Sequence, residues 1–245
     1  MSGSTLQDPT NSTRSTPNID VHDAVLQIGS SALVAAPSTR VWATLLDTST
    51  WPEWNTFVPR VTIRSQPETT QTDTTEPNSA PATETPAPAA STDSTPSLSP
   101  RLCKGTRMTF HVRMDPTSTK PQAARDTHLV VTECVAPDPA AGSPGRIVWV
   151  SDTDAPGGFA PSLLTAERVH EVVDVGKGEA AEVRTWELQR GYLVHVVKWV
   201  FGARLRRNFE LWVSDLRAFV EKGNGGGGGN GDGNGGESSG GNVAA

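Results

Sequence analysis

Histidine and glutamate side chains in the second half of the chain are the residues best suited to chemistry. His170 lies in an apolar-patterned segment, where an imidazole could bind a carbonyl or phenol oxygen or remove a proton as a general base. The alternative is an exposed histidine beside Glu171. Glu167, Glu171 and Glu187 could include an acid catalyst, but no spacing marks a paired-carboxylate site. The catalytic residues are therefore unknown, with His170 and Glu187 as candidates.

No stronger catalytic or cofactor motif accompanies them. The chain lacks HExxH, GxSxG and Walker sequences and has no Cys/His cluster. The glycines at 176–178 and 223–229 lack the strand and helix context that a phosphate loop needs. We therefore expect no cofactor and no metal.

A second set of candidates would contact an apolar ligand. Phe110, Val112 and Met114 alternate with polar residues, which predicts that all three face inward from one strand. Lys198 could meet an acidic head group, or its stem could follow the surface with the amine at the cavity mouth. Three tryptophans could form flat walls against rings or simply pack in the core. These tryptophans are Trp54, Trp149 and Trp186.

A long helix over 193–222 must position several of these residues. At 100° per residue, one face is apolar. It comprises Phe201, Leu205, Phe209, Trp212, Leu216, Phe219 and Val220. Phe201 and Leu205 are candidate ligand contacts from this face. Burying large side chains at about 1.5–3 kcal/mol each requires a wide apolar surface, for which a sheet is the candidate. Lys198 falls on the same stripe, so either Gly202 kinks the helix or the amine points at whatever the sheet encloses.

The rest of the body predicts an α+β fold. Two short helices, each with a proline near its start, are expected at 36–47 and 51–55. Seven segments have strand character. They are 24–34, 58–65, 105–114, 125–135, 146–151, 163–175 and 181–190. Short connections imply antiparallel neighbours. We therefore expect a curved antiparallel seven-stranded sheet wrapped around the long C-terminal helix, with two short helices after the first strand.

The inward face of two strands stays open. In 181–190, either Arg184, Trp186 and Leu188 face inward, or Thr185 and Glu187 do. The same ambiguity applies to 163–175.

Composition divides the 245 residues into one domain and three polar segments. The domain spans 23–222 and is interrupted at 66–100, where Pro, Thr, Ser and Ala dominate. The insertion, the leader 1–22 and the Gly-rich tail 223–245 are expected to be disordered. The net charge is −6, and acids of the insertion account for most of it. The near-neutral body excludes a general nucleic-acid binder.

The sequence predicts a cytoplasmic protein. It contains no signal-peptide h-region and no apolar run of about 18 residues. A mitochondrial transit peptide is the alternative, but Arg14 is the only basic residue before Arg40. Cys103 and Cys134 are expected to be free thiols, although a hairpin over 104–135 would bring them near each other.

The segment 36–58 resembles a known family signature. Ala36-Pro37, Val41-Trp42 and Asp47, followed by Trp51-Pro52-Glu53-Trp54-Asn55 and Phe57-Val58, are similar to the amino-terminal signature of the polyketide cyclase/dehydrase and lipid-transport group. That group belongs to the START-like, helix-grip (SRPBCC) superfamily. The resemblance implies a hydrophobic cavity under the long helix, with a histidine near 170 pointing into it. It nominates Asp115–Pro121, Asp152–Pro161 and Gly191–Leu193 as the cavity rim.

The resemblance does not imply a reaction. We expect binding of a hydrophobic small molecule, such as a lipid, a polyketide-like aromatic or an isoprenoid. One alternative is a cyclase/dehydratase-type lyase or isomerase that uses a cavity His or Glu. Another is a lipid or coenzyme Q carrier that docks on membranes through the last helix. Arg204, Arg206 and Arg207 could serve that docking, or form a solvated face with Glu210. The oligomeric state stays open.

Overall fold

The computed structural model describes residues 14–67, 98–118 and 125–223. A 3₁₀ turn, Val21–Asp23, precedes the first strand. The strands are β1 Leu26–Val34, β2 Arg60–Ser65, β3 Arg107–Val112, β4 Arg125–Val135, β5 Gly145–Ser151, β6 Thr165–Asp174 and β7 Ala181–Arg190. The helices are α1 Ser38–Leu46, α2 Trp51–Trp54 and α3 Val194–Lys222.

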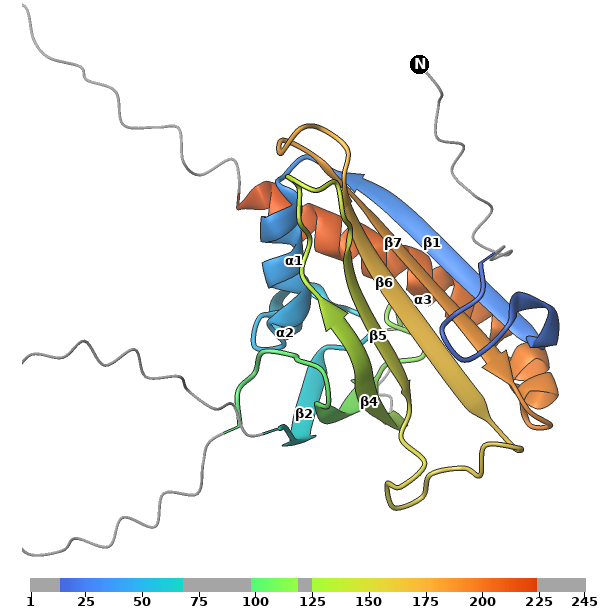
Figure 1. Cartoon of the computed structure of the whole chain (residues 1–245). Helices are drawn as coiled ribbons and strands as arrows, with labels where there is room; N and C mark the ends of the chain where they lie inside the picture. Colours follow the sequence, from blue (N-terminus) through green and yellow to red (C-terminus); the bar gives the residue numbers. More distant parts are fainter. Residues whose placement is uncertain (1–13, 68–97, 119–124, 224–245) are drawn as a thin grey trace, which may run out of the picture.

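The strands form one antiparallel sheet in the order β1-β7-β6-β5-β4-β3-β2. From β2 to β7, successive strands are neighbours, whereas β1 lies at the opposite edge from β2 and pairs with β7. In Figure 1 the curved sheet lies over α3, with α1 and α2 beside the C-terminal half of that helix. The predicted helix-grip architecture is confirmed, and the expected elements differ from the observed ones only at their ends.

Aromatic side chains fill one half of the space between the sheet and α3. The Trp212 ring, from α3, lies 4.9 Å from Trp51, 5.6 Å from Trp54 and 5.2 Å from His170, measured between ring centroids. Trp149 of β5 closes the group at 6.3 Å from Trp212. The tryptophan pairs meet edge to face, and such contacts add to the free energy of area burial. The half of the space near α1 and α2 is therefore solid core.

Residues 14–20 cover the outer face of the sheet, although composition assigns them to a disordered leader. The Asn18 backbone N and side-chain Nδ2 donate to the two carboxylate oxygens of the buried Glu167 at 2.8 and 2.7 Å. Trp186 donates from Nε1 to the Ser15 carbonyl, and Ile19 is buried. We call residues 14–20 the outer strap. Residues 1–13 of the leader, 68–97 of the insertion and 224–245 of the tail lie outside the described residues.

Asp152, the first residue of the β5–β6 loop, fixes this loop to distant strands. Its buried carboxylate accepts hydrogen bonds from Arg64 at the end of β2 and Arg107 at the start of β3. Burial alone would raise the pKa of Asp152, but the hydrogen bonds and charges of both arginines lower it below its usual value. Cys103 and Cys134 are both free in the structure.

We expect Asp152→Asn to lower the free energy of unfolding by about 2–3 kcal/mol at pH 7, because it leaves two arginines without a charged partner. The pKa of Asp152 is lower in the folded than in the unfolded chain. Its contribution is therefore present above the unfolded pKa of about 4 and is lost as the pH falls through the folded value. Urea titrations at pH 7, 5 and 3 should show the difference between the two proteins shrinking with acid.

The matched control is Asp154→Asn, because Asp154 also contacts Arg107 but its side chain is 73% exposed. Its expected effect is below about 1 kcal/mol. Equal losses for both variants would contradict the anchoring role of Asp152.

Candidate functional site

A cavity of about 520 Å³ lies under the first half of α3. Most of its wall is apolar and comes from β3, β4, β5, the β5–β6 loop and α3. The apolar wall residues are Phe57, Val58, Phe110, Val112, Met114, Leu129, Trp149, Phe159, Leu164, Ala166, Val197, Phe201, Leu205 and Phe209. Concave, mainly apolar sites with a few polar groups are the usual form of small-molecule sites.

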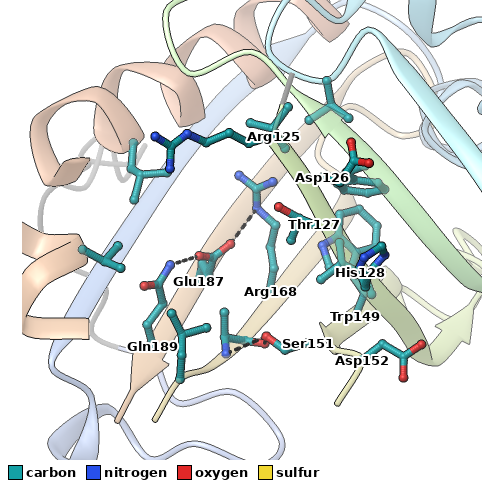
Figure 2. A pocket seen from close by; sticks show the side chains of 18 of the residues that line it. Arg125, Asp126, Thr127, His128, Trp149, Ser151, Asp152, Arg168, Glu187 and Gln189 are labelled. Atoms are coloured by element: carbon teal, nitrogen blue, oxygen red, sulfur yellow. Dashed lines mark hydrogen bonds and ion pairs between the residues drawn. The ribbon is translucent and has the colours of Figure 1, made fainter. Parts of the chain in front are cut away.

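Arg168 of β6 is the outstanding polar group of this cavity (Figure 2). Its side chain is only 4% exposed, and the guanidinium carbon lies 3.6 Å from the centroid of the Phe209 ring and 5.2 Å from that of Trp212. Burial lowers the pKa of Arg168 to about 10, partly offset by the charge of Glu187, so the side chain stays cationic at pH 7. A buried cation therefore faces an apolar cavity.

The hydrogen-bonding capacity of Arg168 is largely unused. Its Nε lies 3.6 Å from a carboxylate oxygen of Glu187, an ion-pair distance that is too long for a hydrogen bond. Neither Nε nor Nη2 donates to any group within the described part of the chain. Unpartnered buried donors cost free energy, and a ligand oxygen would satisfy them. The guanidinium thus retains two donors that no described protein group satisfies.

Glu187 and Gln189 complete the polar wall from β7. Strand register places Arg168 directly opposite Glu187, so the two side chains project from the same face of the sheet. Gln189 Nε2 donates to Glu187 Oε1, which orients the carboxylate. Figure 2 shows Arg168, Glu187 and Gln189 joined in one row along the cavity wall. This row on the wall therefore presents one buried cation, one carboxylate and one amide.

Seven of the residues proposed from sequence line this cavity. They are Phe110, Val112, Met114, Trp149, Glu187, Phe201 and Leu205. Glu187 faces inward, which selects one of the two alternatives for the 181–190 strand. Of the other candidates, His170 and Trp54 lie in the core, Trp186 lies on the outer face of the sheet, and Lys198 lies at the surface.

His170 and Trp54 belong to the solid core rather than to the cavity wall. The His170 ring is fully buried, 4.4 Å from the Trp149 ring and 5.2 Å from the Trp212 ring. It is therefore not an exposed-face histidine, the alternative considered above. Burial, and then the charge of Arg168, hold the pKa of His170 well below its usual value, so the ring is neutral at pH 7. Trp54 is buried against Trp51 and Trp212.

Trp186 and Lys198 lie outside the cavity. Trp186 neighbours Glu187 in β7, so it projects from the opposite, outer face, where it packs with Val148 and Val169 under the outer strap. Lys198 Nζ donates to the Val25 carbonyl at 3.0 Å, just before β1. The amine therefore satisfies a backbone oxygen beside the sheet edge.

The rim follows part of the expectation. Asp152, Gly157, Gly158 and Phe159 of the β5–β6 loop contribute to the cavity wall, whereas residues 119–124 of the β3–β4 connection lie outside the described residues. Arg125 stands over the Phe201 ring at 4.8 Å.

The described part of the chain contains no group of three His, Cys, Asp or Glu side chains arranged to hold a metal ion. None of its helices is long and apolar enough to cross a membrane.

Sequence reasoning missed Arg168. Its position alternates with Glu167 and Val169, so apolar periodicity gave no reason to turn it inward. The available signal was its distance of two residues from His170, since both side chains must share one face of the strand.

Comparison with known proteins supports the fold. No protein-family model matches the chain. A hypothetical protein, jhp0584, from Helicobacter pylori superposes with a TM-score of 0.55 at 13% identity, over 89% of this chain and 99% of that one. The Zhui aromatase/cyclase from Streptomyces sp. R1128 superposes with a TM-score of 0.51 at 12% identity, over 83% and 98%. At such identities these structures show a shared fold.

A curated relative is closer in sequence. The oxopyrrolidines biosynthesis cluster protein O of Penicillium oxalicum is 37% identical over 213 residues, which cover 84% of this chain and 92% of the relative. The chain therefore belongs to the family of this biosynthesis cluster protein, and it has the helix-grip fold of the START-like (SRPBCC) superfamily.

Proposed function

We propose that the protein binds an apolar small molecule that carries a carbonyl or anionic oxygen, with that oxygen on Arg168. The observation that carries the proposal is the buried guanidinium with two unpartnered nitrogens in a mainly apolar cavity. A wholly apolar lipid or isoprenoid would leave those donors unsatisfied. Among the expected ligand classes, an oxygen-bearing, polyketide-like compound fits this wall best.

The curated relative narrows the chemical class. Its name places it in oxopyrrolidine biosynthesis, and an oxopyrrolidine is a five-membered nitrogen ring bearing a carbonyl oxygen. Such a ring presents an acceptor of the kind that Arg168 requires, while an attached apolar chain would lie against Phe110, Trp149 and Phe201. We propose a compound of this class, an intermediate or a product, as the ligand.

Glu187 favours a second candidate, a cyclase/dehydratase-type enzyme. A carbonyl oxygen held by Arg168 would be polarised, which makes protons on the neighbouring carbon more acidic. The Glu187 carboxylate lies on the same cavity wall and could remove such a proton as a general base. In this reading His170 stabilises the core and does not react, because it is enclosed by Trp149 and Trp212.

Native mass spectrometry should detect a co-purified ligand. We expect protein prepared without organic washing to carry one small molecule per chain, whose mass and fragmentation contain a carbonyl or acidic group. Denaturation should release it. A ligand that is a pure hydrocarbon would contradict the role given to Arg168.

We expect Arg168→Met to weaken binding of the anionic probe 8-anilinonaphthalene-1-sulfonate about 10–100-fold, because a charge-assisted hydrogen bond is lost. Binding of the neutral probe Nile red should change less than about threefold, since the apolar wall is retained. Fluorescence titration measures both. The double variant Arg168→Met/Glu187→Gln avoids leaving an unpaired carboxylate.

The control is Arg125→Met, which removes the exposed cavity arginine over Phe201. Its expected effect on the anionic probe is below about fivefold, because solvent screens an exposed charge. If Arg168→Met lost affinity for both probes equally, the substitution would have collapsed the cavity. The double variant, which leaves no unpaired carboxylate, would then show whether the anionic probe depends on Arg168.

If the protein is an enzyme of this type, substitutions of Glu187 and His170 should have different effects. Glu187→Gln should abolish turnover of a carbonyl substrate while keeping its affinity within about threefold, because only the proton acceptor is lost. His170→Ala should instead lower the free energy of unfolding by about 2–4 kcal/mol by opening a cavity between two tryptophans. Product analysis and urea unfolding measure the two effects. Full turnover by Glu187→Gln would exclude Glu187 as the base.

A further inference from the structure

The start of α3 exposes large apolar side chains to solvent. Trp199 is 87% exposed and Tyr192, just before the helix, 78%. Val196 and Val200 are also exposed, and the spacing of 196, 199 and 200 places all three on one face of the helix. The cavity is lined from the opposite side of the helix, by Val197 and by the residues that follow it at intervals of four, Phe201, Leu205 and Phe209. We call Tyr192, Val196, Trp199 and Val200 the exposed face of α3.

Positive charge adjoins this face. From Arg190 to Asn208 the sequence contains five Lys or Arg residues and no Asp or Glu, although the whole chain has a net charge of −6. Arg204 and Arg207 are exposed and lie four and seven residues after Val200, so they continue its side of the helix. Neither arginine forms an ion pair within the described ranges, nor does Arg206 with Glu210. The charge is therefore available to an external partner.

The exposed face belongs to the same segment as the cavity mouth. Val197, Phe201 and Leu205 contact the cavity from the inner side of these same turns. The Tyr192 and Leu193 backbone nitrogens donate to the carbonyls of Ser162 and Leu163, which tie the start of α3 to the β5–β6 loop. Phe159 of that loop lines the cavity and is 52% exposed. A surface that covered the exposed face would lie beside the entrance.

We propose that the exposed face of α3 docks on an anionic lipid membrane and brings the cavity mouth to the lipid surface. Trp and Tyr occupy the boundary between head groups and acyl chains, because their rings are apolar and their edges are polar. Arginines beside them gain from anionic head groups, and no acidic side chain of 190–208 opposes this. A symmetric pairing with a second copy is less suitable, because it would bring the same arginines face to face.

The experiment is flotation of the full chain with vesicles. We expect binding to phosphatidylcholine vesicles that contain 30 mol% phosphatidylserine, and binding at least about fivefold weaker to pure phosphatidylcholine. Raising NaCl from 0.1 to 0.5 M should weaken the first interaction. Trp199→Ser should reduce the affinity about tenfold or more, and Arg204→Gln/Arg207→Gln by a similar factor.

Matched controls remove the same chemistry from the far end of the molecule. Lys177→Gln/Lys222→Gln deletes two exposed charges, and Leu33→Ser deletes one exposed apolar side chain. Both should bind vesicles like the parent chain, and all variants should keep its melting temperature because the residues are exposed. In solution, Trp199→Ser should also keep the affinity for 8-anilinonaphthalene-1-sulfonate, so membrane docking and ligand binding fail independently.

Two results would overturn the docking proposal. One is absence of flotation with anionic vesicles, or flotation that neither variant of the exposed face reduces. The other is concentration-dependent dimerisation in sedimentation velocity that Trp199→Ser abolishes, without vesicle binding, which would assign the face to a second copy.

Discussion

The packing of Trp212 between the sheet and the two short helices determines where this fold is solid and where it is hollow. Its ring touches aromatic side chains from α2, β5 and β6, and the same cluster includes Phe110 through Trp149. Because these rings fill the space near α1 and α2, the remaining volume is displaced toward the start of α3. The cavity is therefore a consequence of where the large residues of α3 stand along the helix.

The fold could be predicted from sequence because its periodicities are strong. The apolar stripe of α3 and the alternation around Phe110 have one consistent phase, and both were assigned to the correct side. In β7 one alternation holds along the whole strand, but the apolar side differs between its two ends: Val183 packs inward in the core, whereas Trp186 packs outward. The inner side is apolar near α1 but polar at the cavity, and the outer side is apolar only where the outer strap covers it. A single rule for the whole strand could not describe both ends.

The site was less predictable because its main polar group breaks the usual rule for charges. Arg168 is an inward arginine in a strand whose other inward residues include His170 and Val172. Burying such a charge with an incomplete partner costs free energy, and apolar residues of similar size would pack at least as well. A cost of this kind at a cavity wall is expected where ligand recognition takes precedence over stability. The two-residue spacing from His170 indicates the side of the strand on which Arg168 lies, but nothing in the sequence indicates that a charge would be buried there at a cost in stability.

The outer strap has a practical consequence for work with shortened chains. Composition invites removal of everything before residue 23, since the leader is rich in Ser and Thr. Such a deletion would take away both donors that hold the Glu167 carboxylate and would uncover the indole of Trp186. The uncovered strands would expose an apolar surface on the outer face of the sheet, opposite Arg168. Aggregation of a chain shortened in this way would therefore result from loss of the outer strap and would not show that the domain fails to fold.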